Sequence, residues 1–250
     1  MPLLSYDRQG SGPTLVWLHG FTQTRSSAHQ FRSILAGTNE LLTLDLPGHG
    51  AAAEVRATLE ETADLLAKVL PEEPLALGGY SFGARVALHV ALRHPGRIGR
   101  LVILGASRGI EDPAERMARR RRDEQLANRM EEIGAKAFLD EWLAQPMFAS
   151  LPTDATERAA RSLNARGLAA SLRLSGTGTQ EWLEPRLHEI TIPTLALAGS
   201  NDAKFSIEAA AIAAGVAHGT CVLIEGAGHA AHLEQPQASA QAVNSFLISG

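Results

Sequence analysis

The run Leu75-Ala76-Leu77-Gly78-Gly79-Tyr80-Ser81-Phe82-Gly83-Ala84 decides the fold of this chain. Its first four residues form a short apolar run, which is typical of a buried strand in a parallel sheet. Helical periodicity follows over residues 84–92. Between the two lies the pattern Gly-x-Ser-x-Gly, whose glycines allow a sharp turn that lifts the serine hydroxyl above the sheet. The run therefore predicts a strand, a tight turn carrying Ser81, and a helix.

Apolar runs of the same kind recur along the chain. They occupy residues 14–18, 41–46, 75–78, 101–104, 194–198 and 221–224. Helical periodicity separates several of them, as in residues 54–70, and a last helix begins at Gln235-Pro236, because proline suits the first helical turn. This alternation predicts an α/β fold, in which a mostly parallel sheet carries helices on both faces.

Composition and charge exclude several classes of protein. The 250 residues are 45% hydrophobic, which excludes a disordered chain, and their number fits one domain. The net charge of −4 gives no basic excess for nucleic acid, and no apolar run reaches the ~18 residues of a membrane span. The single Cys221 excludes a disulfide framework, and its apolar neighbours predict a buried thiol. Since the first residues also lack a secretory pattern, we expect a cytoplasmic protein.

The alternation of strands and helices stops between residues 108 and 188. This segment shows no strand pattern and indicates several helices interrupted by glycine and proline. Ligands of open α/β sheets bind at the carboxyl ends of the strands, so helices inserted between two strands suggest a lid over that edge. The alternative is a purely structural insertion. We expect a core formed by residues 1–107 and 189–250 and a helical lid formed by residues 108–188.

Two further residues complete a candidate catalytic set with Ser81. A serine hydroxyl reacts only when a histidine accepts its proton and a carboxylate orients that histidine. In a fold with this strand–turn–helix arrangement, their chain order is serine, acid, histidine. Asp202 follows the predicted strand 194–198, and His229 follows the predicted strand 221–224. The sequence therefore predicts a Ser81–Asp202–His229 triad at one edge of the sheet.

An oxyanion site needs two backbone N–H groups aimed at one point. One is expected from Phe82, directly after the serine, and the other from Phe21, in the turn His19-Gly20-Phe21. His19 and His49 are interpreted as side chains that bond the backbone of their own turns. No motif in the chain indicates a metal or an organic cofactor.

These motifs carry a resemblance that spans the chain from His19 to the last helix. They resemble the α/β-hydrolase family and, more closely, its menaquinone-pathway synthase branch. The branch resemblance rests on runs at residues 18–21, 45–50, 79–85, 202–205 and 226–232. Members of that branch make 2-succinyl-6-hydroxy-2,4-cyclohexadiene-1-carboxylate by eliminating pyruvate from a 5-enolpyruvyl precursor. The resemblance thus implies a carbon–oxygen lyase of menaquinone biosynthesis that uses no cofactor.

The resemblance also implies a set of substrate-binding residues. They are Tyr80, Arg85, Arg120 within the run Arg119-Arg120-Arg121-Arg122, Trp142 and Arg161. The precursor carries three carboxylates, and arginine binds a carboxylate through a planar two-pronged fork. The alternatives are a surface salt bridge for Arg85, solvated helix faces for Arg120 and Arg161, and packing for Trp142 and Tyr80.

Two rival functions remain open on the sequence. The first is a carboxylesterase or carbon–carbon-bond hydrolase in which Ser81 is a covalent nucleophile. The second is a ligand-sensing protein of the same fold with vestigial turnover. For partners we expect a small anionic substrate, neither nucleic acid nor membrane, and a monomer or small homo-oligomer.

Overall fold

The computed structural model describes residues 4–248 and is built around a seven-stranded sheet. The strand order is β1-β3-β2-β4-β5-β6-β7. Only β1 runs antiparallel, where it pairs with β3 at one edge of the sheet. The strands are β1 Tyr6–Gln9, β2 Thr14–Leu18, β3 Glu40–Leu44, β4 Leu75–Tyr80, β5 Ile98–Leu104, β6 Pro193–Gly199 and β7 His218–Ile224. The predicted α/β fold class is confirmed.

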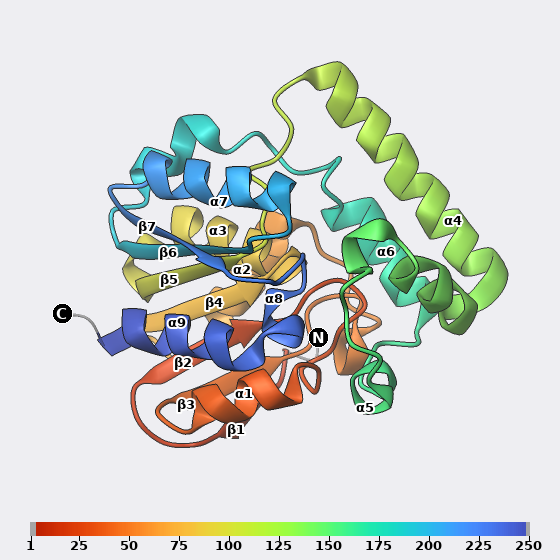
Figure 1. Ribbon diagram of the computed structural model, residues 1–250. Helices are drawn as coiled ribbons and strands as arrows, with labels where there is room; N and C mark the ends of the chain where they lie inside the picture. Colours follow the sequence, from red (N-terminus) through yellow and green to blue (C-terminus); the bar gives the residue numbers. More distant parts are fainter. Residues whose placement is uncertain (1–3, 249–250) are drawn as a thin grey trace.

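Helices cover both faces of the sheet, as Figure 1 shows. Successive strand residues point to opposite faces, so Val16 and Leu18 enter one apolar core while Leu15 and Trp17 enter the other. Helices α2, α3 and α7 pack on the first core, and α1, α8 and α9 pack on the second. Their bounds are α1 His29–Ala36, α2 Leu59–Val69, α3 Phe82–Arg93, α7 Ala203–Gly215, α8 Ala231–Glu234 and α9 Pro236–Ile248.

Helix α2 begins later than the periodicity over residues 54–70 predicts. The Thr58 hydroxyl accepts the N–H of Glu61, and the Glu61 carboxylate accepts the N–H of Thr58 at 2.8 Å. This reciprocal pair is a capping box, and it starts the helix at Leu59. The apolar residues before it belong to the loop.

The prediction that Cys221 is a buried thiol is wrong. Cys221 is exposed because β7 forms an edge of the sheet. Most residues of this strand are exposed, Leu223 among them at 48%. An apolar run marks a strand but does not say whether that strand lies at the centre or the edge.

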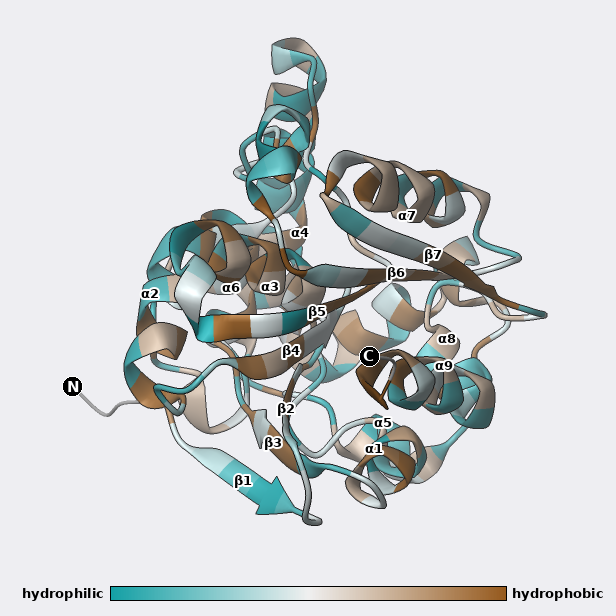
Figure 2. Ribbon diagram, turned by 90° about the vertical axis from the view of Figure 1, so that its left-hand side faces the viewer, coloured by the Kyte–Doolittle hydropathy of each residue, from teal (hydrophilic) through white to brown (hydrophobic). Residues whose placement is uncertain are grey.

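A helical insertion, residues 108–188, connects β5 to β6 and contains no strand along its length, all of which is described. It holds α4 Pro113–Leu143, α5 Ala155–Ala159 and α6 Ala165–Ser175, and α4 breaks at Gly134, where φ is 81°. Helices α4 and α6 lie side by side in Figure 1 and share a small apolar core that includes Met130, Phe138 and Leu168. Figure 2 shows α4 projecting from the rest of the molecule, with hydrophilic residues along much of its ribbon. Over residues 4–248, no helix is both long and apolar enough to span a membrane.

The turn between β4 and α3 depends on close backbone approach at Gly79. A Cβ at this position would lie 2.5 Å from the carbonyl carbon of Gly83 and 2.7 Å from the amide nitrogen of Ala84. We therefore expect Gly79→Ala to lower the free energy of unfolding by about 1–3 kcal/mol, the usual effect of overpacking a tight site. Urea denaturation measures this difference.

The matched control is Gly96→Ala, since a Cβ at Gly96 would meet nothing within 4 Å. This variant should keep the stability of the parent. If the two alanine variants were equally stable, the close approach at Gly79 would not be a constraint on the fold.

Candidate active site

Ser81 lies in the turn between β4 and α3 with a φ of 50°. A positive φ is uncommon for a residue with a Cβ and persists only where the surrounding structure enforces it. The N–H of Ser81 donates to the carbonyl of Leu104 on the neighbouring strand β5, and the Ser81 carbonyl accepts the N–H of Arg85 in the first turn of α3. The sharp turn predicted from the glycine pattern is thus present, and it points the serine out of the sheet edge.

The structure brings the three predicted triad residues together. The Nε2 of His229 lies 3.4 Å from the Ser81 hydroxyl, and its Nδ1 lies 2.8 Å from a carboxylate oxygen of Asp202. A nucleophile–base contact of this length is usual without substrate and shortens in the reacting complex. The other carboxylate oxygen of Asp202 accepts the N–H of Phe205 and caps α7.

The ionised state of Asp202 fixes the histidine. Partial burial raises the pKa of this carboxyl, but the hydrogen bond and charge of His229, together with the Phe205 N–H and the charge of Lys204, hold the pKa below its usual value. An ionised Asp202 accepts the Nδ1–H of His229, which leaves Nε2 free to accept the serine proton. The arrangement can therefore generate a serine alkoxide or a serine-based general base.

Glu234 positions the loop that carries His229, a role that the sequence analysis missed. Its carboxylate accepts the N–H of Gly228 at 2.7 Å and the N–H of Ala230 at 3.0 Å, on either side of the histidine. A carboxylate five residues after a predicted catalytic histidine is a weak pattern, because nothing in the sequence says that it folds back.

A cavity of about 460 Å³ opens over Ser81 and His229. Tyr80 and Trp142, two of the predicted substrate-binding residues, line it, and so does Phe21, the predicted oxyanion donor. The Tyr80 ring packs on Gly20, and the Trp142 ring meets Phe21 edge-on, with the ring centroids 5.1 Å apart. Burial raises the pKa of Tyr80, so its hydroxyl stays protonated and can donate a hydrogen bond into the cavity.

Three cationic side chains also line this cavity: Arg119, Arg122 and Lys204. Arg119 forms an ion pair with Asp123 at 2.8 Å, whereas Arg122 has no ion pair within residues 4–248. Among the described residues that line the cavity, the one acid is Asp202, which His229 already engages. The cavity therefore carries an excess of positive charge and suits an anionic ligand.

The structure does not bring Arg120 to the cavity. Arg120 lines a separate hollow with Arg116 and Arg173, whereas Arg119 and Arg122 face the triad. Residues three apart share a helix face, so Arg119 and Arg122 point together and Arg120 points elsewhere. A run of four arginines gives no sequence basis for choosing among them.

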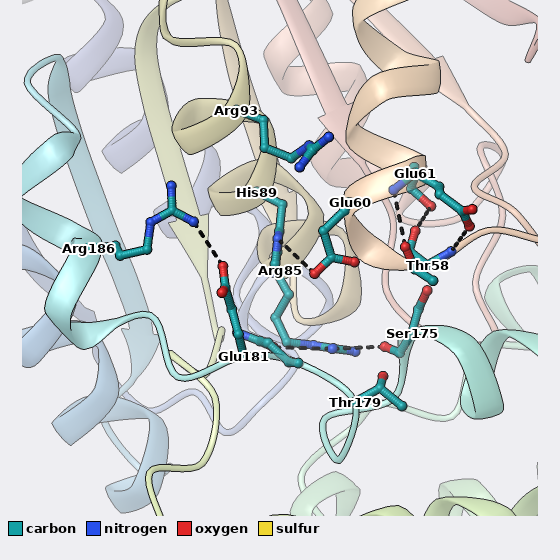
Figure 3. A network of polar contacts seen from close by, with 12 residues as sticks. Thr58, Glu60, Glu61, Arg85, His89, Arg93, Ser175, Thr179, Glu181 and Arg186 are labelled. Carbon is teal, nitrogen blue, oxygen red and sulfur yellow. Dashed lines mark hydrogen bonds and ion pairs between the residues drawn. The ribbon is translucent and has the colours of Figure 1, made fainter.

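Arg85 also lies outside the cavity wall. Its guanidinium is buried and donates to the carbonyl of Ser175 at 2.9 Å and to the side chain of Gln180 at 3.3 Å, and Figure 3 shows it pointing at Ser175. Burial, with the nearby charge of Arg119, lowers the pKa of Arg85 to about 10. Ser175 ends α6, and helix-terminal carbonyls lack partners inside their helix. Arg85 therefore ties the insertion to the core.

Arg161, the third predicted arginine, is buried against Thr22 and is not part of the cavity wall. Phe82 begins α3 directly after the serine, in the position expected of an oxyanion donor.

His19 donates through Nδ1 to its neighbour Gly20 and accepts the N–H of Leu46 through Nε2, and burial lowers its pKa to about 4. His19 thus bonds the backbone of its own turn at Gly20, as predicted, and also a backbone group outside that turn, at Leu46.

Comparison with known proteins identifies the family of the chain. A model of the Alpha/beta hydrolase family matches residues 15–242. The 2-succinyl-6-hydroxy-2,4-cyclohexadiene-1-carboxylate synthase of Citrobacter koseri is 37% identical over 238 residues, 91% of each chain. The synthase of that name from Photorhabdus laumondii is 33% identical and covers 94% of this chain and 85% of its own.

Two solved structures extend the comparison. MenH from S. aureus matches with a TM-score of 0.90 and 30% identity, over 99% of this chain and 98% of its own. A thermophilic esterase from Thermogutta terrifontis matches with a TM-score of 0.82 and 26% identity, over 98% of this chain and 92% of its own.

The triad geometry predicts the effect of Asp202→Asn. An amide in this place no longer fixes the Nδ1–H form of His229, so the reactivity of Ser81 should fall by on the order of 10³–10⁴. The second-order rate of labelling by a fluorophosphonate, followed by intact-mass spectrometry, measures that reactivity. Asp154→Asn, at the exposed cap of α5, is the control and should label at the parent rate. Equal rates for both variants would remove Asp202 from the triad.

Proposed function

The chain belongs to the alpha/beta hydrolase family and to its 2-succinyl-6-hydroxy-2,4-cyclohexadiene-1-carboxylate synthases, and we propose from this premise how its site eliminates pyruvate. The reaction is that of a carbon–oxygen lyase in menaquinone biosynthesis. The observation that carries the proposal is one cavity that holds both a Ser-His-Asp geometry and an excess of cationic side chains. A tricarboxylate substrate needs such charges, whereas a neutral ester does not.

In the first step, the enzyme removes a proton from carbon. His229, held by Asp202, takes the proton of the Ser81 hydroxyl, and the serine oxygen removes the hydrogen on the ring carbon that bears the succinyl group. The bonding electrons move into the succinyl carbonyl and form an enolate. A preorganised pair of N–H groups stabilises such charge as it develops. We assign this role to the backbone amides of Phe21 and Phe82.

In the second step, the enolate electrons return through the ring double bond. The carbon–oxygen bond to the enolpyruvyl group breaks, and the oxygen leaves with the bonding electrons as the enolate of pyruvate, which takes up a proton at carbon. The ring keeps two conjugated double bonds. Ser81 keeps the proton that it took from the ring carbon, and protonated His229 gives its proton to the released enolate, so the chain ends the cycle unchanged and no covalent enzyme intermediate forms.

Substrate carboxylates are assigned to the cationic side chains of the cavity wall. Arg122 is the main candidate, because it lines the cavity and lacks a protein partner within the described residues, and Arg119 and Lys204 add to the field. Tyr80 and Trp142 form the walls beside the serine. Arg85 acts from behind the wall, through its charge and through its hold on the insertion. The insertion serves as the lid of this cavity.

We place the reaction in the cytoplasm. With Cys221 as its one cysteine, the chain cannot form an internal disulfide, which suits a reducing compartment. The partner of the site is a small anionic substrate.

Elimination and ester hydrolysis predict different products and kinetics. The enzyme should release pyruvate from 2-succinyl-5-enolpyruvyl-6-hydroxy-3-cyclohexene-1-carboxylate without a product burst, because the serine acts as a base. Lactate dehydrogenase coupling detects the pyruvate in stopped flow. Ser81→Ala should lose several orders of magnitude in kcat. Hydrolysis of aryl esters without any pyruvate release would replace the lyase by the esterase alternative.

The two faces of α4 give a matched pair of variants. Arg122→Ala should lower kcat/KM for the tricarboxylate by about 10-fold or more, equivalent to about 1.4 kcal/mol. The parent kcat/KM should also fall as salt rises, because the attraction is screened. Arg120→Ala, on the face turned from the cavity, should keep the parent value. The reverse ranking of the two variants would show that Arg120 is the substrate ligand.

A further inference from the structure

The turn that carries the Phe21 amide has an unfavourable residue at its third position. The N–H of Gln23 donates to the carbonyl of Gly20 at 3.1 Å, which closes a four-residue turn with Phe21 and Thr22 at its centre. Thr22 has a φ of 66°. A turn with positive φ at this position normally carries glycine or asparagine, because a β-branched side chain is strained there. Since Thr22 is only 1% exposed, the strain lies inside the protein.

A buried glutamine holds this turn from the core side. The Gln23 side-chain oxygen accepts the N–H of Gly20 at 2.8 Å, so the turn is closed a second time. The Gln23 amide nitrogen then donates to Nε2 of His232 at 3.2 Å. Gln23 and His232 are each 1% exposed. His232 must be neutral to accept this bond, and burial with the charge of Arg161 holds its pKa near 3.

The helical insertion holds the same turn from the other side. Arg161 donates through Nη1 to the Thr22 hydroxyl at 2.6 Å, and the N–H of Ser162 donates to the Thr22 carbonyl at 2.8 Å. Arg161 is 7% exposed. The side chain and the carbonyl of Thr22 are therefore both fixed, which is the over-determination that a strained residue requires.

We propose that Gln23, His232 and Arg161 are positioning residues that hold Thr22 in its strained conformation and so aim the Phe21 amide into the oxyanion site. Gln23 and His232 act from the core, and Arg161 acts from the insertion. The proposal rests on the proposed use of Phe21 as an oxyanion donor. It gives Arg161 a role through Thr22 rather than through the substrate, which agrees with its absence from the cavity wall.

The reaction stage at which negative charge forms next to the Phe21 amide determines which kinetic constant should change. The change is expected when Gln23, His232 or Arg161 no longer holds the turn. The oxyanion donors stabilise charge that develops in the transition state and the enolate and is absent from the bound substrate. A misaimed amide therefore lowers kcat and leaves KM nearly unchanged. Removing one oxyanion donor costs about 10²–10³ in rate, so a loosened donor should cost about 10–100-fold. A residue that only stabilises the fold would lower the amount of folded enzyme but not kcat per folded molecule.

The first arm of the test replaces Gln23 with an apolar side chain of similar length. Gln23→Met should lower kcat for pyruvate release by about 10–100-fold per folded enzyme, with KM within about twofold. Asn39→Leu is the control. Asn39 is a buried amide with three hydrogen-bond partners at the start of β3, at the opposite edge of the sheet from Ser81. It should lose stability but keep kcat.

The second arm separates strain from other effects of the substitution. Thr22→Gly removes the strain, because glycine adopts positive φ readily, whereas Thr22→Val keeps the strain and removes the hydroxyl. The loss caused by Gln23→Met should therefore shrink in the Thr22→Gly background and persist in Thr22→Val. If Gln23→Met does not fold, His232→Leu takes its place in the same cycle, because His232 supports the turn through Gln23 and not through the Thr22 hydroxyl. An equal loss in both backgrounds, or a loss in KM alone, overturns the proposal.

Fluorophosphonate labelling of Ser81 provides a readout that does not depend on the natural substrate. Its phosphoryl oxygen needs the same oxyanion donors, so the labelling rates should follow the ranking of kcat. If the parent enzyme labels rapidly but releases no pyruvate, the proposed function fails while the labelling cycle still decides the positioning proposal. If the parent releases pyruvate and Gln23→Met keeps both rates, only the positioning proposal fails.

Discussion

The backbone of Ser81 is the constraint on which the rest of this structure depends. Its φ of 50° is sustained because β4 ends against β5 on one side and α3 begins at once on the other. The close approach at Gly79 leaves no room for a side chain. This geometry fixes the serine oxygen relative to the carboxyl edge of the sheet, so every other functional group must reach that edge to act.

Parallel strands bring those groups to the edge. Asp202 follows β6 and His229 follows β7, and the register of the neighbouring strands sets both loops beside Ser81. Backbone hydrogen bonds then refine the positions. Asp202 caps α7, and Glu234 accepts the amides on both sides of His229. The carboxylates that orient the catalytic groups are thus also the carboxylates that close the local backbone.

The helical insertion does more than cover the cavity. It supplies the cationic wall through α4, and its segment around Arg161 holds Thr22 beside the proposed oxyanion donor. Arg85 ties its far end, at Ser175, to α3. A second strained residue, Thr22, therefore lies beside the proposed oxyanion donor, and its support comes partly from the core and partly from the insertion.

The sequence by itself determined the α/β fold, the order of the central strands along the chain and the Ser81–Asp202–His229 set, because these follow from local patterns at strand ends. The sequence did not determine how deeply a side chain is buried or which way it points. Cys221 became exposed because β7 lies at an edge, and Arg120 turned away because only Arg119 and Arg122 share the inward helix face. Arg85 bonds a backbone carbonyl 90 residues away in the chain, and Arg161 bonds a hydroxyl 139 residues away. Only tertiary packing decides such contacts, since a cation in a sequence carries no information on which surface will bury it.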